Sequence, residues 1–116
     1  MLITVSEKEG VIIFRLSGGI ISPGIKEISE TVEEALTVSS SPLRFVFDLK
    51  KVAQIDSSGL GALMKIHSAI HPREGKIAVI NVNKHVKNLI VMARLITVFE
   101  NFESEDDAIA ALSKKS

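Results

Sequence analysis

Residues 45–63 read FVFDLKKVAQIDSSGLGAL, and the change of pattern inside this stretch decides the fold class. Residues 45–49 form a short, almost continuously apolar run, which is typical of a strand buried on both faces of a sheet. Past Asp56, Ser57, Ser58 and Gly59, here called the DSSG turn, the apolar positions recur with the period of a helix. They are Leu60, Leu63, Met64, His67 and Ile70. A buried strand that leads into an amphipathic helix predicts an α/β domain.

The sequence before this stretch predicts a β-hairpin and one helix. Residues 2–5 and 11–16 are rich in β-branched and large apolar side chains, and the polar residues 6–10 between them indicate a turn. A helix of roughly three to four turns is expected next, with Ser22 before Pro23 as its cap. Its apolar face comprises Ile25, Ile28, Val32, Ala35 and Leu36. Three serines and a proline then end this helix.

The sequence after residue 63 predicts two more strands and two more helices. Residues 77–80 indicate a buried strand, and residues 97–99 a last brief one. Asn83 is expected to cap the helix between them, and Ser104 with Asp107 has the spacing of a capping box ahead of a fourth helix. The apolar positions of these helices are Val86, Leu89, Ile90 and Ala93, then Ala108, Ile109, Ala111 and Leu112.

Together these elements predict one domain over residues 1–112. The expected architecture is a mixed, mostly parallel sheet of four or five strands, with about four helices packed mainly on one face. Residues 113–116 are expected to form a disordered tail.

Composition and charge exclude several classes of function. A chain of 116 residues with 46% apolar and 24% charged residues is an ordinary globular domain with one core. Because 14 basic residues balance 14 acidic ones, no net field attracts nucleic acid or an anionic membrane surface. The absence of cysteine excludes disulfides and thiolate chemistry, and the three histidines lack the spacing of a metal site. We therefore expect no metal and no cofactor.

The sequence also bears on location. The first residues enter a strand pattern with no basic segment ahead of them, which is unlike a signal peptide, and no apolar run approaches the ~20 residues of a membrane span. We therefore expect a cytoplasmic protein that does not insert into membranes.

The DSSG turn is where we expect function. Ligands of open α/β sheets bind beyond the carboxyl ends of the strands, and the first turn of a helix favours negative charge. A phosphate on Ser57 or Ser58 would add a charge of about −1.5 to −2 and could break an interface without unfolding the domain. Gly59 and Gly61 would let another protein approach the hydroxyls closely. On the residues alone, a plain helix cap remains the simpler interpretation.

Catalysis and nucleotide binding have little support. His67 lies about two turns along the same helix, too far to act as a base for either serine. Gly59-Leu60-Gly61 lacks the third glycine of a dinucleotide-binding motif and the Gly-Lys-Ser/Thr of a P-loop. No catalytic residue is predicted, and we do not expect an enzyme.

A family resemblance adds to this interpretation. Val46-Phe47-Asp48-Leu49, then Val52, then residues 55–63 resemble the central signature of STAS domains in bacterial anti-sigma-factor antagonists. The resemblance extends more loosely over nearly the whole chain, and it implies a STAS-type fold.

The same resemblance implies residue roles. The second serine of the family motif is the phosphorylation site, which corresponds to Ser58, with Ser57 as second choice; Asp56 and Ser57 shape and tune the site. The unphosphorylated form is expected to bind an anti-sigma factor that is also a serine kinase, which regulates transcription indirectly, and a phosphatase resets the cycle. The expected partner-binding residues are Asp56, Ser57, Ser58, Gly59, Leu60 and Gly61.

The chain departs from the family pattern at two places. Gly18-Gly19-Ile20-Ile21 stands where an acidic residue is common, and the two isoleucines are either core or a surface for a different partner. Arg94 stands where a glycine is common, which indicates an altered local backbone or a basic contact. These departures motivate an alternative function as a STAS adaptor without a sigma-factor partner, in a signalling scaffold or as the cytoplasmic subunit of a lipid transporter.

Overall fold

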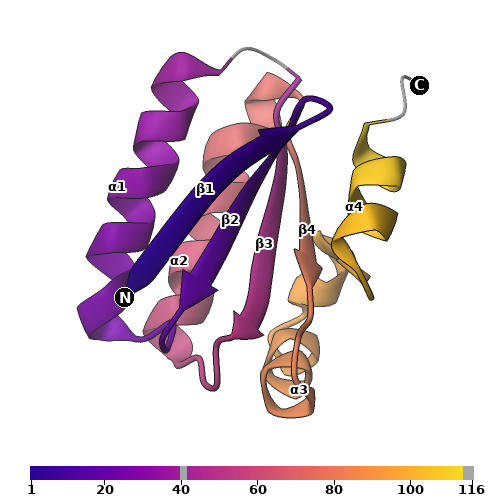
Figure 1. The fold of residues 1–116 in the computed structure, drawn as a ribbon. Helices are drawn as coiled ribbons and strands as arrows, with labels where there is room; N and C mark the ends of the chain where they lie inside the picture. The colour runs from indigo at the N-terminus through magenta and orange to yellow at the C-terminus, as the bar shows by residue number, and fades with distance from the viewer. Residues whose placement is uncertain (40–41, 114–116) are drawn as a thin grey trace.

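The structure, a computed structural model, describes residues 1–39 and 42–113, and its centre is a five-stranded sheet in the order β1-β2-β3-β4-β5 (Figure 1). The strands are β1 (Leu2–Lys8), β2 (Val11–Ser17), β3 (Arg44–Lys51), β4 (Lys76–Ile80) and β5 (Phe99–Phe102). The helices are α1 (Ser22–Val38), α2 (Ser57–Ile70), α3 (Lys84–Met92) and α4 (Glu105–Leu112), with short 3₁₀ helices η1 (His71–Arg73) and η2 (Leu95–Thr97). Only β1 and β2 pair antiparallel, so the predicted mixed, mostly parallel sheet is confirmed.

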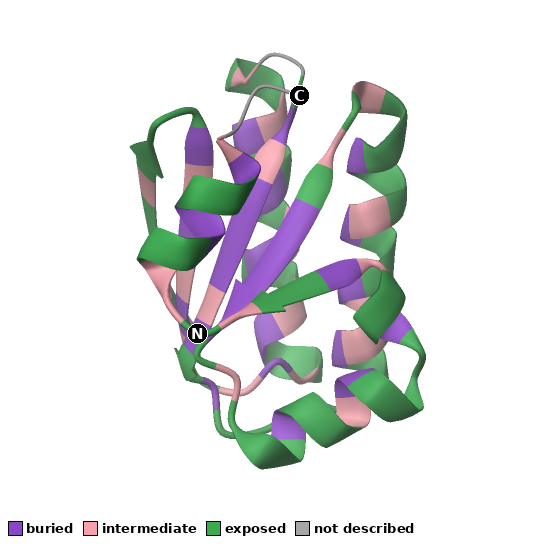
Figure 2. Cartoon of the chain, turned by 90° about the vertical axis from the view of Figure 1, so that its right-hand side faces the viewer, coloured by how far each residue is buried: buried purple, intermediate pink, exposed green. Residues whose placement is uncertain are grey.

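The helices cover the two faces of the sheet unequally. Helices α1, α2 and α3 bury Ile28, Ile66 and Ile90 in the larger core on one face. Helix α4 covers the other face, where Ala108 and its neighbours pack against residues of β2, β3 and β4. Figure 2 shows the buried residues along the central strands and the inner sides of the helices. The predicted α/β architecture, with the helices mainly on one face, is confirmed.

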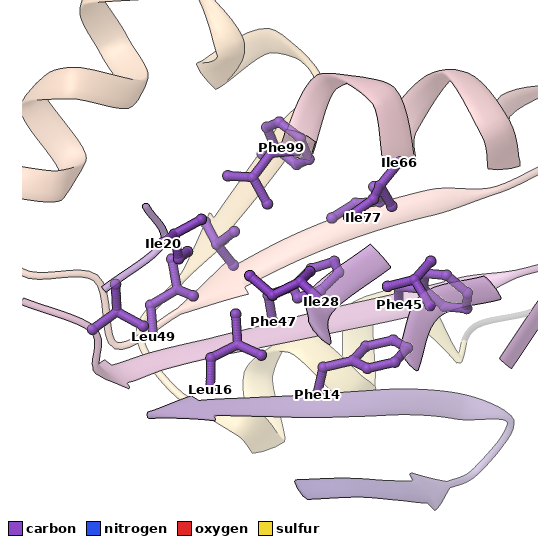
Figure 3. Packing of buried hydrophobic residues seen from close by; sticks show 14 of the residues in the cluster. Phe14, Leu16, Ile20, Ile28, Phe45, Phe47, Leu49, Ile66, Ile77 and Phe99 are labelled. Carbon is purple, nitrogen blue, oxygen red and sulfur yellow. The ribbon is translucent and has the colours of Figure 1, made fainter. Parts of the chain in front are cut away.

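Three phenylalanines fill the centre of the larger core. The ring of Phe14 on β2 stacks on Phe47 of β3, with the centroids 5.0 Å apart, and meets Phe45 edge-on at 5.1 Å. Figure 3 shows these rings beneath the helices, with Ile28 of α1 close by. This packing joins β2 to β3 and so fixes the position of the end of β3, from which the chain continues to the DSSG turn.

The hairpin turn is tighter than predicted. Strand β1 continues to Lys8, so only Glu9 and Gly10 separate the two strands, whereas residues 6–10 were expected to turn. Both turn residues have positive φ, 53° and 80°. Two such residues in sequence are typical of the two-residue hairpin turn whose twist matches that of the strands.

The start of α1 was predicted wrongly. Ser22 is the first residue of the helix and not its cap, and the capping position is occupied by Ile21, which makes no side-chain cap hydrogen bond. Pro23 lies in the first turn, where a missing N–H removes no intrahelical hydrogen bond. The helix has 17 residues, which makes it longer than the three to four turns expected.

Two later elements also differ from the prediction. Helix α2 buries Gly59, Leu63, Ile66 and Ile70, whereas Met64, predicted on the apolar face, is 40% exposed. The last strand begins at Phe99 and not at residue 97, because residues 95–97 form η2, which buries Leu95.

The predicted caps of the last two helices are confirmed. The Asn83 side chain accepts from the N–H of Val86, and the Ser104 hydroxyl accepts from the N–H of Asp107. Within the described ranges, no helix is long and apolar enough to cross a membrane. The domain limit at residue 112 stays a prediction, and most of the predicted tail, residues 114–116, lies outside the described residues.

Candidate functional site

The DSSG turn forms the N-cap and first turn of α2, and residues 52–55 join it to the end of β3 at the carboxyl edge of the parallel strands (Figure 1). Asp56 is the N-cap of α2: its carboxylate accepts from the N–H of Gly59 at 2.8 Å, and its carbonyl accepts from the N–H of Leu60 at 2.9 Å. Ser57 and Ser58 are the first two residues of the helix, and both are exposed. The cap therefore holds the backbone of the turn while both serines face solvent.

Gly59 is where α2 rests on the loop that follows β2. A β-carbon at this position would lie 2.0 Å from the carbonyl oxygen of Ile20 and 2.8 Å from the side chain of Ile55. Any larger residue would push the helix away from the loop, so glycine is required for this close approach. Gly59 is itself buried, and it acts as a support for the turn.

The loop after β2 is hydrogen-bonded to the segment that leads into the DSSG turn. Ile20 forms an isolated parallel bridge with Ile55. Its N–H donates to the carbonyl of Gln54 at 3.0 Å, and its carbonyl accepts from the N–H of Asp56 at 3.3 Å. Ile20 is fully buried and Ile21 is half-buried. Of the two interpretations left open for this pair, the structure therefore supports core for Ile20.

A second loop braces the same region from the side of β4. The Asn83 amide group, besides capping α3, donates through Nδ2 to the carbonyl of Val52 at 3.0 Å. Asn81 donates to the carboxylate of Asp48 at 3.1 Å. The cap is visible in the sequence, but the bond to Val52 is not, because no local pattern indicates that two distant loops are paired.

The exposed surface around the serines combines hydroxyls with apolar side chains. Ser57, Leu60 and Met64 follow one another at helical spacing along α2, with Leu60 half-buried and Met64 exposed. A β-carbon on Gly61 would meet nothing within 4 Å, which leaves this part of the helix open. Protein interfaces are enriched in methionine and place a polar rim around an apolar centre, which this arrangement of Met64 and Leu60 beside the serines resembles. The exposure of Met64 was not predicted, because its spacing also fits the buried stripe of α2.

The histidines are placed as packed or surface side chains. The ring of His67 faces Phe99 with the centroids 6.3 Å apart and lies 5.4 Å from the ring of His71. His71 and His85 are exposed. Among residues 1–39 and 42–113, no group of three or more His, Cys, Asp or Glu side chains could hold a metal ion.

Arg94 adopts a backbone conformation that favours glycine. It lies between α3 and η2 with φ 62° and ψ 24°, in the left-handed region. A residue with a β-carbon is strained there. An arginine therefore occupies a left-handed position that glycine adopts without strain.

The chain is similar to known proteins along nearly its whole length. The STAS domain family matches residues 3–108. The anti-sigma F factor antagonist of Paenibacillus polymyxa is 29% identical over 110 residues, which cover 95% of this chain and 93% of that protein.

Solved structures show the same fold. An anti-sigma factor antagonist from Mycobacterium paratuberculosis matches with a TM-score of 0.85 at 22% identity, covering 97% of this chain and 94% of that one. The anti-sigma factor antagonist SpoIIAA in its unphosphorylated form matches with a TM-score of 0.79 at 13% identity, covering 99% and 100%. The Bacillus cell fate determinant SpoIIAA in the phosphorylated form matches with 0.72 at 14% identity, covering 95% and 98%.

Proposed function

The chain belongs to the STAS domain family, and we propose that it is an anti-sigma-factor antagonist that phosphorylation of Ser58 switches off. The observation that carries this proposal is the placement of Ser58 within the DSSG turn. It is exposed in the first turn of α2, on a backbone held by the Asp56 cap and by the contact between Gly59 and Ile20. A modifying enzyme can therefore reach the hydroxyl without unfolding the domain.

The position explains why a phosphate would act on binding and not on folding. The first turn of a helix has N–H groups without intrahelical partners and a positive dipole end, both of which stabilise a phosphate. The same phosphate adds about −1.5 to −2 charges beside the Asp56 carboxylate, on the face that we assign to the partner. A docked protein would have to accommodate that charge. We expect the complex to dissociate while the domain stays folded.

The partner class follows from the names of the relatives. Because relatives are named anti-sigma factor antagonists, we infer that the partner of this chain is an anti-sigma factor. We further infer that this anti-sigma factor is the serine kinase that modifies Ser58. A phosphatase would restore the binding form. In this cycle the chain is a cytoplasmic binding protein and a substrate, and it catalyses no reaction.

A phosphorylation assay tests the proposal. The full chain is incubated with ATP and the anti-sigma factor of its host, and intact mass is measured. We expect one added phosphate in the wild type and in Ser57→Ala, and none in Ser58→Ala. Phosphate on another residue, or none with any serine kinase of the host, would refute the proposal.

The alternative adaptor function has lost part of its motivation. It depended on an apolar loop that could serve a different partner, but Ile20 is fully buried and bridges Ile55. Co-purification from native cells separates the two functions. Recovery of transporter subunits or a scaffold in place of an anti-sigma factor would favour the adaptor.

A further inference from the structure

A groove lies between the outer edge of β1 and the second half of α1. It has a volume of about 360 Å³, and Val5, Glu7 and Ile12 of the hairpin line it opposite Glu34, Ala35 and Val38 of α1. We call it the β1–α1 groove. Its apolar walls are open to solvent, since Val5 is 47% and Val38 is 80% exposed. Figure 1 shows α1 running alongside β1 at this edge of the sheet.

The strand that borders the groove is a free edge. Within the described residues, β1 pairs with β2 alone, so its other side presents backbone N–H and C=O groups to solvent. This edge is 7 residues long, against 4 for β5 at the opposite edge. An extended segment can pair with such an edge and place alternate side chains into the adjoining groove.

The charge of the groove indicates what kind of segment would bind. Glu7 and Glu34 line it, and Glu30, one helical turn before Glu34, is also exposed. Of the basic residues on or against α1, Lys26 lies near the opposite end of the helix, and the guanidinium of Arg73 donates to the carbonyls of Leu36 and Ser39. Val5 and Glu7 lie on the same face of β1, so the acidic rim and apolar walls together complement a segment that presents both apolar and basic side chains on one face.

The sequence of β1 argues against a second copy of this chain as the occupant. In an antiparallel two-fold pairing of β1 with β1 centred on Val5, Glu7 of one copy would lie opposite Ile3 of the other. Residues 2–5 of that second copy contain no basic side chain that could pair with Glu7 or Glu34. An extended basic segment of a different protein can pair with both glutamates.

The groove and the DSSG turn lie at opposite ends of the sheet. Ile12, which lines the groove, pairs with Phe45 at the start of β3, whereas the DSSG turn follows the end of that strand. We propose that the β1–α1 groove is a second binding site, which takes an extended apolar and basic segment of a partner protein as an added strand. Both sites can then be occupied at once, so this binding is independent of Ser58.

Two synthetic peptides probe the site on the full chain. The first is acetyl-VTKTVTK-amide, whose valines and lysines share one face, and the second, acetyl-VTETVTE-amide, has glutamate in place of each lysine. Chemical shifts of the backbone amides, recorded at physiological salt, locate the site. We expect the lysine peptide to shift residues 5–7 and 31–39 and to bind roughly tenfold or more tightly than the glutamate peptide. Methylation of alternate peptide nitrogens should abolish binding, since it removes N–H donors from the added strand.

Protein variants test the assignment of the rim. Glu34→Lys should weaken binding of the lysine peptide roughly tenfold, whereas Glu33→Lys, on the same helix but outside the groove, should change it less than threefold. Ser58→Ala should bind the peptide as the wild type does. The proposal is overturned by shifts confined to the acidic residues 100–107 or to the DSSG turn, or by equal binding of the two peptides. It is also overturned if sedimentation shows a dimer that the lysine peptide dissociates, because the edge would then be occupied by a second copy.

Discussion

A β-carbon on Gly59 would lie 2.0 Å from the carbonyl oxygen of Ile20, so the backbones of α2 and of the loop after β2 meet at this point. The backbone of Ile20 cannot move aside for a new β-carbon as a flexible side chain could. We expect Gly59→Ala to lower the free energy of unfolding by roughly 1–3 kcal/mol or more, measured by urea denaturation.

Gly61, two residues further along α2, provides the matched control. A β-carbon there meets nothing within 4 Å, so Gly61→Ala should raise stability by about 0.5–1 kcal/mol through the better helix propensity of alanine. Equal effects of the two substitutions would show that the contact between Gly59 and Ile20 does not support the DSSG turn.

The Asn83 side chain has two separable roles. Asn83→Asp keeps the acceptor for Val86 but loses the Nδ2 donor to the carbonyl of Val52, so we expect a loss of about 0.5–1.5 kcal/mol. Asn83→Ala loses the cap as well and should cost about 1 kcal/mol more. Urea denaturation gives both values, and amide exchange of residues 52–55 should be faster in both variants. An Asp variant as stable as the wild type would mean that the bond to Val52 contributes nothing.

Arg94 is a site where stability can be gained. Because its φ of 62° strains any residue with a β-carbon, Arg94→Gly should raise the free energy of unfolding by about 0.5–1 kcal/mol. Arg94→Ala removes the charge without relieving the strain and should bring no gain. Thermal denaturation of both variants measures the gain. An equal gain from alanine and glycine would show that the charge, and not the backbone, limits stability.

Met64 extends the proposed docking surface beyond the DSSG turn. Its side chain is 40% exposed on the stripe of α2 that begins at Ser57, so Met64→Ala should weaken binding of the anti-sigma factor by about 1 kcal/mol, roughly fivefold, with little change in stability. Met92→Ala at the end of α3 removes a more exposed methionine and serves as the control. Calorimetric titration compares the two, and equal effects would place Met64 outside the interface.

The parts of this fold that depend on local chemistry were predictable. Asp56, Asn83 and Ser104 each cap an N–H three residues further along the chain, so the signal and its partner lie in the same short stretch. For the same reason the position of the candidate site, at the start of the helix after β3, was visible in the sequence.

The parts that depend on contacts between distant segments were not predictable. The positions of Met64 and Ile66 both fit a helical stripe, and only packing against the sheet decides which of them is buried. Likewise, pairing with β4 selects residues 99–102 as the last strand, although Glu100 and Asn101 have low β-propensity. The support of the DSSG turn by Ile20 belongs to the same class, since nothing near Ile20 in the sequence indicates it.

A phosphate on Ser58 should control binding of an anti-sigma factor, and one calorimetric titration decides whether it does. The anti-sigma factor is titrated with the unphosphorylated chain and with the chain phosphorylated at Ser58, the site being verified by mass spectrometry. We expect the phosphate to weaken binding at least about tenfold, or 1.4 kcal/mol, while the melting temperature of the domain hardly changes. Equal affinity of the two forms would show that the phosphate does not control binding.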